Sequence, residues 1–531
     1  MALTLASAAA LLSEHHLLRE IIHGNVWTLD PQRIGPAAQA PVRDVTYDTR
    51  TVTAGSMLFC KGNFKAEYLS GVDDKGLAVY VAETDFSAAT KAPGLIVNDV
   101  RRAMSLLAAA FFGRPQDSLT VVGITGTKGK TTTAYFTQAI LNAASGGRAA
   151  LFSSVDNCLD GHTYAESDLT TPESLDAFRM MHEAVANGMQ YLVMEVSSQA
   201  YKVDRVYGLT FDVGAFLNIS PDHISPIEHP TFEDYLHCKR QITVNSRALV
   251  LGADCAHADL SREDAAAGHV PVTTFALRNG NGNGDANGTA DAGTAPADVT
   301  ARPATADHSA YEIVADGTSL GEFRLALDGD FNYANAAAAI AIAHAAGVAL
   351  DNTEALHALE PVTVAGRMER FEDPQSNTVA IVDYAHNYAS VTALLDYVDE
   401  RYGTRNPRIT LVTGSAGDKA FDRRKEIVQA AEHRIANFVF TAEDTNTEPF
   451  IDICMEMQGY ITVPDVASTV ISDRTTAVTN AVYDARAHAD RFNVLLIIGK
   501  GNERWIKDRN RHVPYEGDDH VIERLFGLNQ K

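Results

Sequence analysis

The chain has 531 residues, of which 46% are hydrophobic and 21% are charged, and its formal net charge is -24 at pH 7. This length exceeds what one hydrophobic core usually organises, so we expect a globular protein of about two to four domains. The acidic excess excludes a general binder of nucleic acid or of anionic membranes, because such binders need a basic surface.

The first region, residues 1–113, is predicted to combine short strands and helices. Residues 1–22 are typical of an amphipathic helix and lack the basic start of a signal peptide. No run approaches the roughly 18 apolar residues of a membrane span, and the cysteines form no Cys-x-x-Cys pair. We therefore expect a cytoplasmic protein without a membrane span, a disulfide framework or a zinc site.

Residues 119–136 predict a phosphate-binding loop. An apolar, β-branched run indicates a buried strand, two glycines interrupt it, and a helix start follows. In such a loop the backbone N–H groups bind a polyphosphate, Lys130 reaches the terminal phosphates, and the Thr131 hydroxyl is a Mg²⁺ ligand. The usual pattern has glycine at the position of Ile124, whereas Gly123 stands one residue earlier, so an ordinary glycine turn is the alternative.

Polar side chains follow two further strands of the predicted sheet. The alternation of strands and helices favours a mainly parallel α/β sheet, with buried strands at 191–197, 212–219 and 248–253. Glu195 is placed to hold Mg²⁺ against a nucleotide, and a capping or solvent-facing glutamate is the alternative. Asn218, Asp222 and His223 follow the next strand, and we expect His223 at the site rather than in a structural role.

Three segments organise the rest of the chain. Residues 278–306 are rich in Gly, Asn, Ala and Thr, and we expect a disordered surface loop without a catalytic role. Residues 331–347 predict an Ala-rich helix. A third α/β unit begins near Thr363, and polar residues end its strands at the sheet edge where α/β folds bind ligands; these strands are predicted at 378–386, 408–414, 437–444 and 493–501.

Eight motifs between Asp48 and Glu503 carry a family resemblance: GITGTKGKTT, MEVSSQA, NISPDHISPIEHPTFEDYLHCKRQ, FNYAN, AGRMERF, VDYAHN, GSAGDK and GKGNE. In this order they resemble the Mur ligases, ATP-dependent amide-forming enzymes of peptidoglycan precursor synthesis. Within the family the chain is similar to enzymes that add the third amino acid to UDP-N-acetylmuramoyl-L-alanyl-D-glutamate. The resemblance implies three α/β domains: a uridine-nucleotide domain (1–113), a central P-loop ATPase-like parallel sheet (114–362) and a Rossmann-like amino-acid-binding domain (363–531).

The resemblance also implies a set of site residues. Catalytic roles fall on Lys130, Glu195, His223 and Lys239. ATP would be bound by Gly126, Thr127, Lys128, Gly129, Lys130, Thr131, Thr132, Asn332, Asn335, Arg367, Asp383 and His386. Two Mg²⁺ ions would be held by Thr131, Glu195, His223 and Lys239, the last as a carbamate. The muramoyl-dipeptide nucleotide would be bound by Thr49, Arg50, Thr170, Thr171, Pro172, Ser197, Ser198 and Arg205.

The third amino acid is predicted from the residues that would surround it. Enzymes that add meso-diaminopimelate carry Asp-Asn-Pro-Arg, whereas this chain has Glu-Asp-Thr-Asn at 443–446, so Asn446 replaces the cation that holds the distal carboxylate. Arg424 is expected to bind the α-carboxylate. Gly499 is also expected at this subsite, and Asp444, Glu448 and Glu503 give it an acidic character that suits a side-chain ammonium. We favour L-lysine, with L-ornithine and meso-diaminopimelate as alternatives. The alternative for Glu448 and Glu503 is that they face solvent and have no role in binding.

The implied reaction passes through an acyl phosphate on the D-Glu carboxylate, which the amino group of the incoming amino acid then attacks. Its partners are the UDP-linked dipeptide and a free amino acid, and we expect a monomer. A folylpolyglutamate synthase-like ligase shares this chemistry, but the uridine-type first region and the Thr-Thr-Pro segment speak against it. A nucleotide switch without an acyl acceptor is a further alternative, which ADP release dependent on both substrates would exclude.

Overall fold

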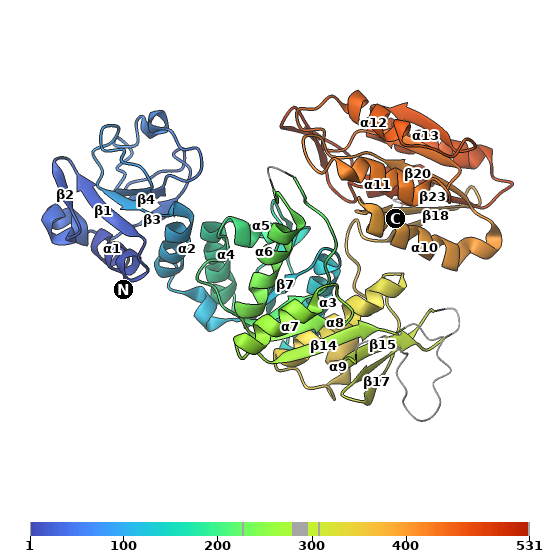
Figure 1. Ribbon diagram of the computed structural model, residues 1–531, viewed down its shortest axis with the longest axis horizontal. Helices are drawn as coiled ribbons and strands as arrows, with labels where there is room; N and C mark the ends of the chain where they lie inside the picture. The colour runs from blue at the N-terminus through green and yellow to red at the C-terminus, as the bar shows by residue number, and fades with distance from the viewer. Residues whose placement is uncertain (1, 226–227, 279–295, 306–307, 529–531) are drawn as a thin grey trace.

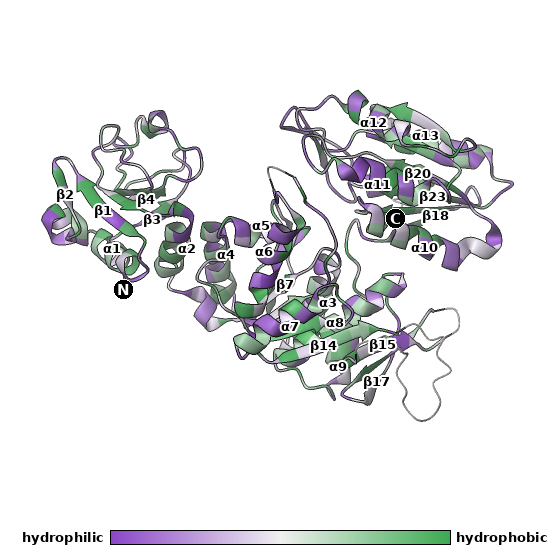
Figure 2. Cartoon of the chain, viewed as in Figure 1, coloured by the Kyte–Doolittle hydropathy of each residue, from purple (hydrophilic) through white to green (hydrophobic). Residues whose placement is uncertain are grey.

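The computed structural model describes residues 2–225, 228–278, 296–305 and 308–528, which form three large sheets in succession along the chain (Figure 1). Hydrophobic residues run along the strands, and hydrophilic residues gather on covering helices such as α6 and α11 (Figure 2). The predicted α/β class, with parallel-rich sheets, is confirmed. None of the helices in the described residues combines the length and apolar character that a bilayer crossing needs.

The N-terminal sheet has the strand order β2-β1-β6-β5-β4-β3, with β3 to β6 parallel. Its elements are α1 (Leu5–Glu14), β1 (Leu18–His23), β2 (Val26–Thr28), β3 (Asp44–Thr46), β4 (Ser56–Phe59), β5 (Val79–Ala82), β6 (Gly94–Val97) and α2 (Val100–Phe111). Because β3 and β4 are parallel neighbours, the turn after β3 and the loop after β4 lie at the same edge of the sheet.

The prediction of one helix over residues 1–22 was wrong in its second half. Helix α1 ends at Glu14, His16 adopts a left-handed backbone conformation, and β1 follows. Ile21 and Ile22 are both fully buried and pack into different hydrophobic clusters, one on each face of the sheet. The apolar run therefore serves a strand that is covered on both faces, which periodicity alone does not distinguish from a helix.

The central sheet has the order β10-β9-β8-β11-β7-β12-β13-β14-β15-β16-β17, and the strands from β8 to β15 in this order are parallel. The strands are β7 (Thr120–Thr125), β8 (Ala149–Phe152), β9 (Asp156–Cys158), β10 (Tyr164–Glu166), β11 (Tyr191–Glu195), β12 (Phe211–Phe216), β13 (Ser246–Gly252), β14 (Val272–Leu277), β15 (Val299–Pro303), β16 (Tyr311–Ala315) and β17 (Thr318–Phe323). The helices are α3 (Lys130–Ser145), α4 (Ser174–Ala186), α5 (Ser198–Lys202), α6 (Phe232–Val244), α7 (Ala258–Ala267), α8 (Asp330–Ala345) and α9 (Thr353–His357).

Small residues allow the middle of this sheet to pack closely. Strand β7 lies between β11 and β12, and a Cβ at Gly123 would lie 2.7 Å from the ring of Phe211. Close packing against Phe211 therefore accounts for glycine at position 123 inside the strand. The predicted Ala-rich helix is α8, whose residues from Ala336 to Ala343 are all fully buried against α3 and the sheet.

The predicted loop at 278–306 is corrected at its C-terminal end. Val299 and Ala301 are buried at alternate positions of β15, which pairs with β14 on one side and β16 on the other. Asp298 fixes the start of this strand, because its carboxylate accepts hydrogen bonds from the Thr274 N–H (2.6 Å) and hydroxyl (2.7 Å). Residues 279–295 of the predicted loop lie outside the described residues.

The C-terminal sheet has the order β18-β19-β23-β20-β21-β22, parallel except for β18. Its elements are β18 (Glu369–Asp373), β19 (Thr378–Asp383), α10 (Tyr388–Tyr402), β20 (Arg408–Thr413), α11 (Asp422–Ala431), β21 (Asn437–Thr441), α12 (Phe450–Gly459), β22 (Ala467–Ile471), α13 (Arg474–Ala487), β23 (Asn493–Ile498) and α14 (Asp518–Phe526), with a hairpin of β24 (Trp505–Asp508) and β25 (Arg511–Pro514). The strands predicted from Thr363 onward are all present as β19, β20, β21 and β23.

Candidate active site

The loop between β7 and α3 has the geometry of a phosphate-binding loop. Gly129 has a positive φ of 81° and directly precedes Lys130, the first residue of α3. A Cβ at Gly129 would lie 2.3 Å from the Asn335 side-chain oxygen, so only glycine allows α8 to approach the loop this closely. Lys130 Nζ donates to the carbonyl of Gly126 at 2.9 Å. Its ammonium therefore lies over the loop, at the position where a bound phosphate needs a cation.

A short chain of oxygen atoms links Thr131 to the buried Glu195. The Thr131 and Ser154 hydroxyls are 3.0 Å apart, and Glu195 Oε1 accepts from the Ser154 N–H (2.8 Å) and hydroxyl (3.1 Å). A hydroxyl and a carboxylate beside a phosphate loop are the hard oxygen donors that Mg²⁺ prefers. The residues present thus fit a Mg²⁺ ion between Thr131 and Glu195.

Lys239 lies on α6 beneath the loop and is only 2% exposed. Its Nζ donates to the carbonyl of Gly126 at 2.8 Å and lies 4.9 Å from the centre of the Tyr235 ring. Burial, together with the nearby charge of Lys130, holds the pKa of Lys239 well below its usual value. Burial therefore favours the neutral amine over the ammonium, and the neutral amine is the form that adds carbon dioxide to become a carbamate.

A cavity of about 980 Å³ lies between the central sheet and the C-terminal sheet. The structure brings fifteen of the predicted site residues to its wall: Thr127, Lys128, Gly129, Lys130, Thr131, Thr132, Thr170, Glu195, His223, Asn332, Asn335, Arg367, Asp383, His386 and Glu503. The other predicted residues do not line it: Thr49, Arg50, Gly126, Thr171, Pro172, Ser197, Ser198, Arg205, Lys239, Arg424, Asp444, Asn446, Glu448 and Gly499. The wall residues thus come almost entirely from the set assigned to ATP and metal.

Asp222 joins the two walls of the cavity. It is 8% exposed, and its Oδ1 accepts from Arg423 Nη2 at 2.5 Å. Its Oδ2 accepts from the Asn387 side chain at 3.1 Å and lies 3.8 Å from Lys128 Nζ. These cations hold the pKa of Asp222 well below its usual value despite burial. One carboxylate of the central sheet therefore binds two residues of the C-terminal sheet, a contact we call the Asp222 junction.

Burial also changes the protonation of the cationic groups near Asp222. It lowers the pKa of Lys128 to about 8, with Asp222 partly restoring it. His386 accepts at Nε2 from Lys128 (3.4 Å) and donates from Nδ1 to the Tyr384 carbonyl (2.6 Å). Burial and the charge of Lys128 hold the pKa of His386 well below its usual value, so the ring is neutral. A bound anion would therefore stabilise the charged forms of Lys128 and His386 in this wall.

The remaining wall residues assigned to the nucleotide form two groups. On α8, Asn335 donates to Asn332 at 3.1 Å, and Asn332 donates to the Asp328 carbonyl at 2.7 Å. In the C-terminal sheet, Arg367 lies 4.5 Å from the centre of the Tyr384 ring. Asp383 accepts from the N–H groups of residues 368 and 385, and burial raises its pKa. These contacts fix the positions of the polar side chains in both groups.

His223 and His229 have different surroundings within one loop. The His223 ring is 41% exposed and faces the cavity, with Nδ1 3.3 Å from Glu228. His229 is fully buried, and burial lowers its pKa. The neutral ring donates from Nδ1 to Asp234 (2.6 Å) and accepts at Nε2 from the Ser198 hydroxyl (2.9 Å). Ser198, predicted to contact substrate, is therefore engaged in holding this loop against α5.

The residues assigned to the incoming amino acid are bonded to one another. Arg424 is 2% exposed and forms ion pairs with Glu448 (2.6 Å) and Glu456 (2.5 Å). Lys500 is 1% exposed, binds Asp444 at 2.8 Å and also pairs with Glu503. The predicted acidic set is therefore present, but each carboxylate already has a cation as partner.

Two backbone positions shape the same subsite. Asn446 adopts a positive φ of 53° and donates from its side chain to the Gly417 carbonyl at 2.7 Å. Gly499 has a φ of 102°, and a Cβ there would lie 2.5 Å from Glu443 Oε2. Asn502, which departs from the usual motif, accepts from the Tyr384 hydroxyl at 2.8 Å. The site of the missing arginine is thus occupied by a short amide that bonds to the backbone.

The residues assigned to the nucleotide-linked dipeptide lie toward the N-terminal sheet. Arg50, whose side chain is 88% exposed, pairs with Asp48 in the turn after β3. The Thr171 hydroxyl donates to the Glu195 carbonyl at 2.9 Å and accepts from the Ser197 N–H at 3.0 Å. Pro172 is buried beside it. Arg205 donates to the Thr171 carbonyl at 3.2 Å.

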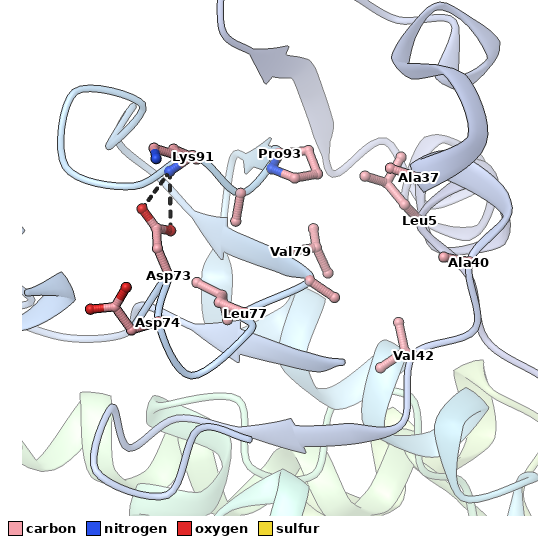
Figure 3. A pocket seen from close by; sticks show the side chains of 12 residues that line it. Leu5, Ala37, Ala40, Val42, Asp73, Asp74, Leu77, Val79, Lys91 and Pro93 are labelled. Atoms are coloured by element: carbon pink, nitrogen blue, oxygen red, sulfur yellow. Dashed lines mark hydrogen bonds between the residues drawn. The ribbon is translucent and has the colours of Figure 1, made fainter. Parts of the chain in front are cut away.

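A separate hollow of about 450 Å³ lies in the N-terminal sheet (Figure 3). Leu5, Ala37, Val42 and Val79 give it an apolar lining, and Asp73 at its rim accepts from the Lys91 N–H. None of the predicted site residues lines this hollow. It borders the segments that precede β3, β5 and β6, so it lies at the sheet edge opposite the turn that carries Arg50.

Sequence reasoning missed three residues of the site. Asn387 ends the motif VDYAHN but was given no role, and Arg423 stands next to Arg424, so considering each neighbour of an assigned residue would have found them. Ser154 follows β8 and contacts Thr131 and Glu195, but a serine after a strand carries no signal of its own.

Fold and site together define a nucleotide-dependent enzyme with a phosphate loop and a cavity closed by a second α/β sheet. Two family models match the chain: "Mur ligase middle domain" over residues 124–343 and "Mur ligase, glutamate ligase domain" over residues 366–501. The chain belongs to the Mur ligase family of ATP-dependent amide-forming ligases.

Curated relatives and a solved structure agree with this membership. The chain is 74% identical over 528 residues to the UDP-N-acetylmuramyl-tripeptide synthetase of Bifidobacterium longum, covering 99% of this chain and 100% of that protein. It is 39% identical over 538 residues to the UDP-N-acetylmuramoyl-L-alanyl-D-glutamate--L-lysine ligase of Enterococcus faecalis, covering 100% of both. A solved UDP-N-acetylmuramoyl-L-alanyl-D-glutamate--2,6-diaminopimelate ligase shares the fold, with a TM-score of 0.60 and 21% identity over 94% of this chain and 99% of that one.

Proposed function

We propose that this chain uses ATP to join L-lysine, as the third amino acid, to UDP-N-acetylmuramoyl-L-alanyl-D-glutamate in peptidoglycan precursor synthesis. The observation that carries the proposal is the cavity in which the phosphate loop, Glu195 and His386 of the C-terminal sheet surround one space. The named relatives from Bifidobacterium longum and Enterococcus faecalis support the substrate class.

The chemistry requires activation of a carboxylate, because oxide is not a leaving group at neutral pH. Transfer of the ATP γ-phosphoryl group to the D-Glu side-chain carboxylate produces an acyl phosphate, which the lysine amine attacks with departure of phosphate. Lys130 stabilises the negative charge that moves in the transfer, and the walls of the cavity keep water from the acyl phosphate. Mg²⁺, when bound, neutralises phosphate charge.

Two Mg²⁺ ions are proposed, held by the chain's own oxygen and nitrogen donors. Thr131 and Glu195 supply hard oxygens close to the loop, and His223 faces the same cavity. Lys239 fits a carbamate because burial lowers the pKa of its amine and because its Nζ and that of Lys130 donate to the same Gly126 carbonyl. Conversion to a carbamate would replace a buried positive group by a negative ligand.

The choice of lysine is supported by the charges around the subsite. The carboxylates of Asp444, Glu448, Glu456 and Glu503 outnumber the cations of Arg424 and Lys500. A side-chain ammonium lowers this excess of negative charge, whereas the second carboxylate of meso-diaminopimelate raises it. Asn446 offers no cation for such a carboxylate. L-Ornithine differs from L-lysine by one methylene and satisfies the same charges.

We further propose that the chain works as a monomer in the cytoplasm, with domains at 1–113, 114–362 and 363–531. The sheet that each segment carries supports these bounds. The cytoplasm is supported by the proposed substrates, since the reaction uses ATP and a nucleotide-linked precursor.

The test is release of phosphate from ATP with the UDP-linked dipeptide and one amino acid at a time. We expect the highest kcat/KM with L-lysine, measurable turnover with L-ornithine, and none above background with meso-diaminopimelate. Equal turnover with meso-diaminopimelate would overturn the amino-acid assignment. ADP release that needs neither the dipeptide nor an amino acid would overturn the ligase itself. In the full reaction, ¹⁸O from the D-Glu carboxylate is expected in the released phosphate.

A further inference from the structure

Three cations converge on one carboxylate where the N-terminal sheet meets the central sheet. Glu173, at the start of α4, binds Lys61 Nζ at 2.8 Å and Arg205 Nη2 at 2.9 Å, and lies 3.6 Å from Arg101 Nη1. Lys61 follows β4, Arg101 is in the first turn of α2, and Arg205 follows α5. The Glu173 side chain is 11% exposed. We call these four residues the Glu173 cluster.

The cluster carries more positive than negative charge. The ion pairs of the described residues give Lys61, Arg101 and Arg205 no second carboxylate, so the local balance favours positive charge by two. Arg102, a neighbouring cation at this junction, has two carboxylates of its own: it binds Asp204 at 3.1 Å and lies 3.4 Å from Asp99. Like charges held this close repel one another, so the cluster is stabilised by a further anion.

The Glu173 cluster lies between the turn after β3 and the cavity, where the middle of an extended ligand would lie. Lys61 lies at the same sheet edge as the turn that carries Thr49 and Arg50, because β3 and β4 are parallel neighbours. On the other side, Thr170 lines the cavity, three residues before Glu173. Helices α2 and α4 lie side by side between the two sheets (Figure 1). A ligand that reaches from the uridine-side turn to the phosphate loop must therefore pass the Glu173 cluster.

We infer that Lys61 and Arg101, together with Arg205, bind the diphosphate of the nucleotide-linked substrate. This inference rests on the proposed function, and it adds two residues that the family motifs do not contain. The substrate has uridine at one end, the acceptor carboxylate at the other and a diphosphate between them, in the order in which the structure places the turn, the cluster and the cavity. A diphosphate in such a diester carries two negative charges, which equals the excess of the cluster.

The two N-terminal cations have distinct geometric roles. The Lys61 ammonium lies 4.3 Å from the centre of the Tyr47 ring, and the Tyr47 hydroxyl donates to Asp176 of α4 at 2.5 Å. Lys61 is thus held in place by a ring that is itself fixed to the central sheet. Arg101 makes only the longer contact to Glu173, which leaves its planar donors available for a phosphate.

The experiment is calorimetric titration of the full chain with UDP and, separately, with uridine. In Lys61→Met and Arg101→Met the UDP dissociation constant is expected to rise about tenfold or more, because each loses a charge-assisted hydrogen bond. The uridine dissociation constant is expected to stay within about twofold. Lys61→Arg should retain most of the UDP affinity. Glu173 keeps two cations in each variant, so the junction stays paired.

Arg102→Met is the matched control, since Arg102 is adjacent in α2, crosses the same junction and is already paired with Asp204. It is expected to change neither affinity. UDP affinities of Lys61→Met and Arg101→Met equal to that of the unmodified chain would overturn the inference, as would a parallel loss of UDP and uridine binding, which indicates a packing role. An unmodified chain that binds neither ligand would instead remove the proposed function, and the inference with it.

Discussion

The central sheet meets its two neighbours in the same way, through one carboxylate surrounded by cations from both sides. At the C-terminal junction Asp222 binds Arg423 and Asn387 and faces Lys128. At the N-terminal junction the carboxylate is Glu173, with Lys61, Arg101 and Arg205. In both, the cations hold the carboxylate pKa below its usual value although burial acts in the opposite direction.

The two junctions differ in how the remaining positive charge is accommodated. Around Asp222, burial lowers the pKa of Lys128 to about 8 and holds the pKa of His386 well below its usual value, so burial disfavours the charged form of both groups. Around Glu173, Lys61, Arg101 and Arg205 share one carboxylate, and the Lys61 and Arg205 side chains are both only 18% exposed. At one junction burial therefore disfavours positive charge, whereas the other holds three cations around one carboxylate, an excess that an anionic ligand would balance.

The largest expected effect is a loss of kcat when Lys130 of the cavity wall is replaced. Lys130→Ala should lower kcat by at least about 10³-fold, because the phosphoryl transfer loses its nearest cation. UDP affinity, measured by calorimetry, should stay unchanged because the Glu173 cluster is untouched. Lost UDP binding in this variant would show that the two junctions are not independent.

Lys239→Ala should remove turnover to a similar degree, through loss of a metal ligand. Addition of a small carboxylate such as acetate at millimolar concentration should restore part of the rate, because the space of the carbamate becomes free. Full activity of Lys239→Ala without any carboxylate would contradict the carbamate. The assay is phosphate release, with Lys130→Ala as the variant that acetate should not restore.

Asp222→Asn tests the C-terminal junction with little change of shape. Arg423 and Lys128 lose their common counter-charge, and we expect kcat/KM to fall about tenfold or more while UDP affinity stays constant. Asp264→Asn, which breaks the ion pair with Arg240 between α6 and α7, is the control. Steady-state kinetics that do not distinguish the two variants would remove the role of the Asp222 junction.

Glu369 shows what happens to a half-buried carboxyl group whose neighbours include two carboxylates and a single cation, Arg504. Burial and nearby Asp519 and Glu523 raise its pKa to about 7, from an ordinary value of 4.5. A raised carboxyl pKa means that ionisation favours unfolding, so stability falls as the pH rises from about 4.5 through 7. Glu369→Gln should therefore raise the thermal unfolding midpoint by about 2 °C or more at pH 8 and change it little at pH 5.

The main features of the phosphate site could be predicted from the sequence because local order encodes them. Strand, glycine loop and helix at 119–136 follow from apolar patterning and from backbone needs, and Lys130, Thr131 and Glu195 lie where that pattern indicates. The strand at Leu18–His23 was taken for helix because its apolar residues face both sides of the sheet, and the short strand Val299–Pro303 was taken for part of a loop because it follows a Gly- and Ala-rich segment.

By itself the sequence determined the class of fold, the order of its sheets and the glycine loop that precedes α3, since each depends on neighbours within a few residues. Only the tertiary structure decided which charges stand together. Asp222 and Arg423 are 201 positions apart, and Lys61 and Glu173 are 112 apart. The balance of charge at each junction depends on distances in space and on exclusion of water, and neither is written in local patterns of residues.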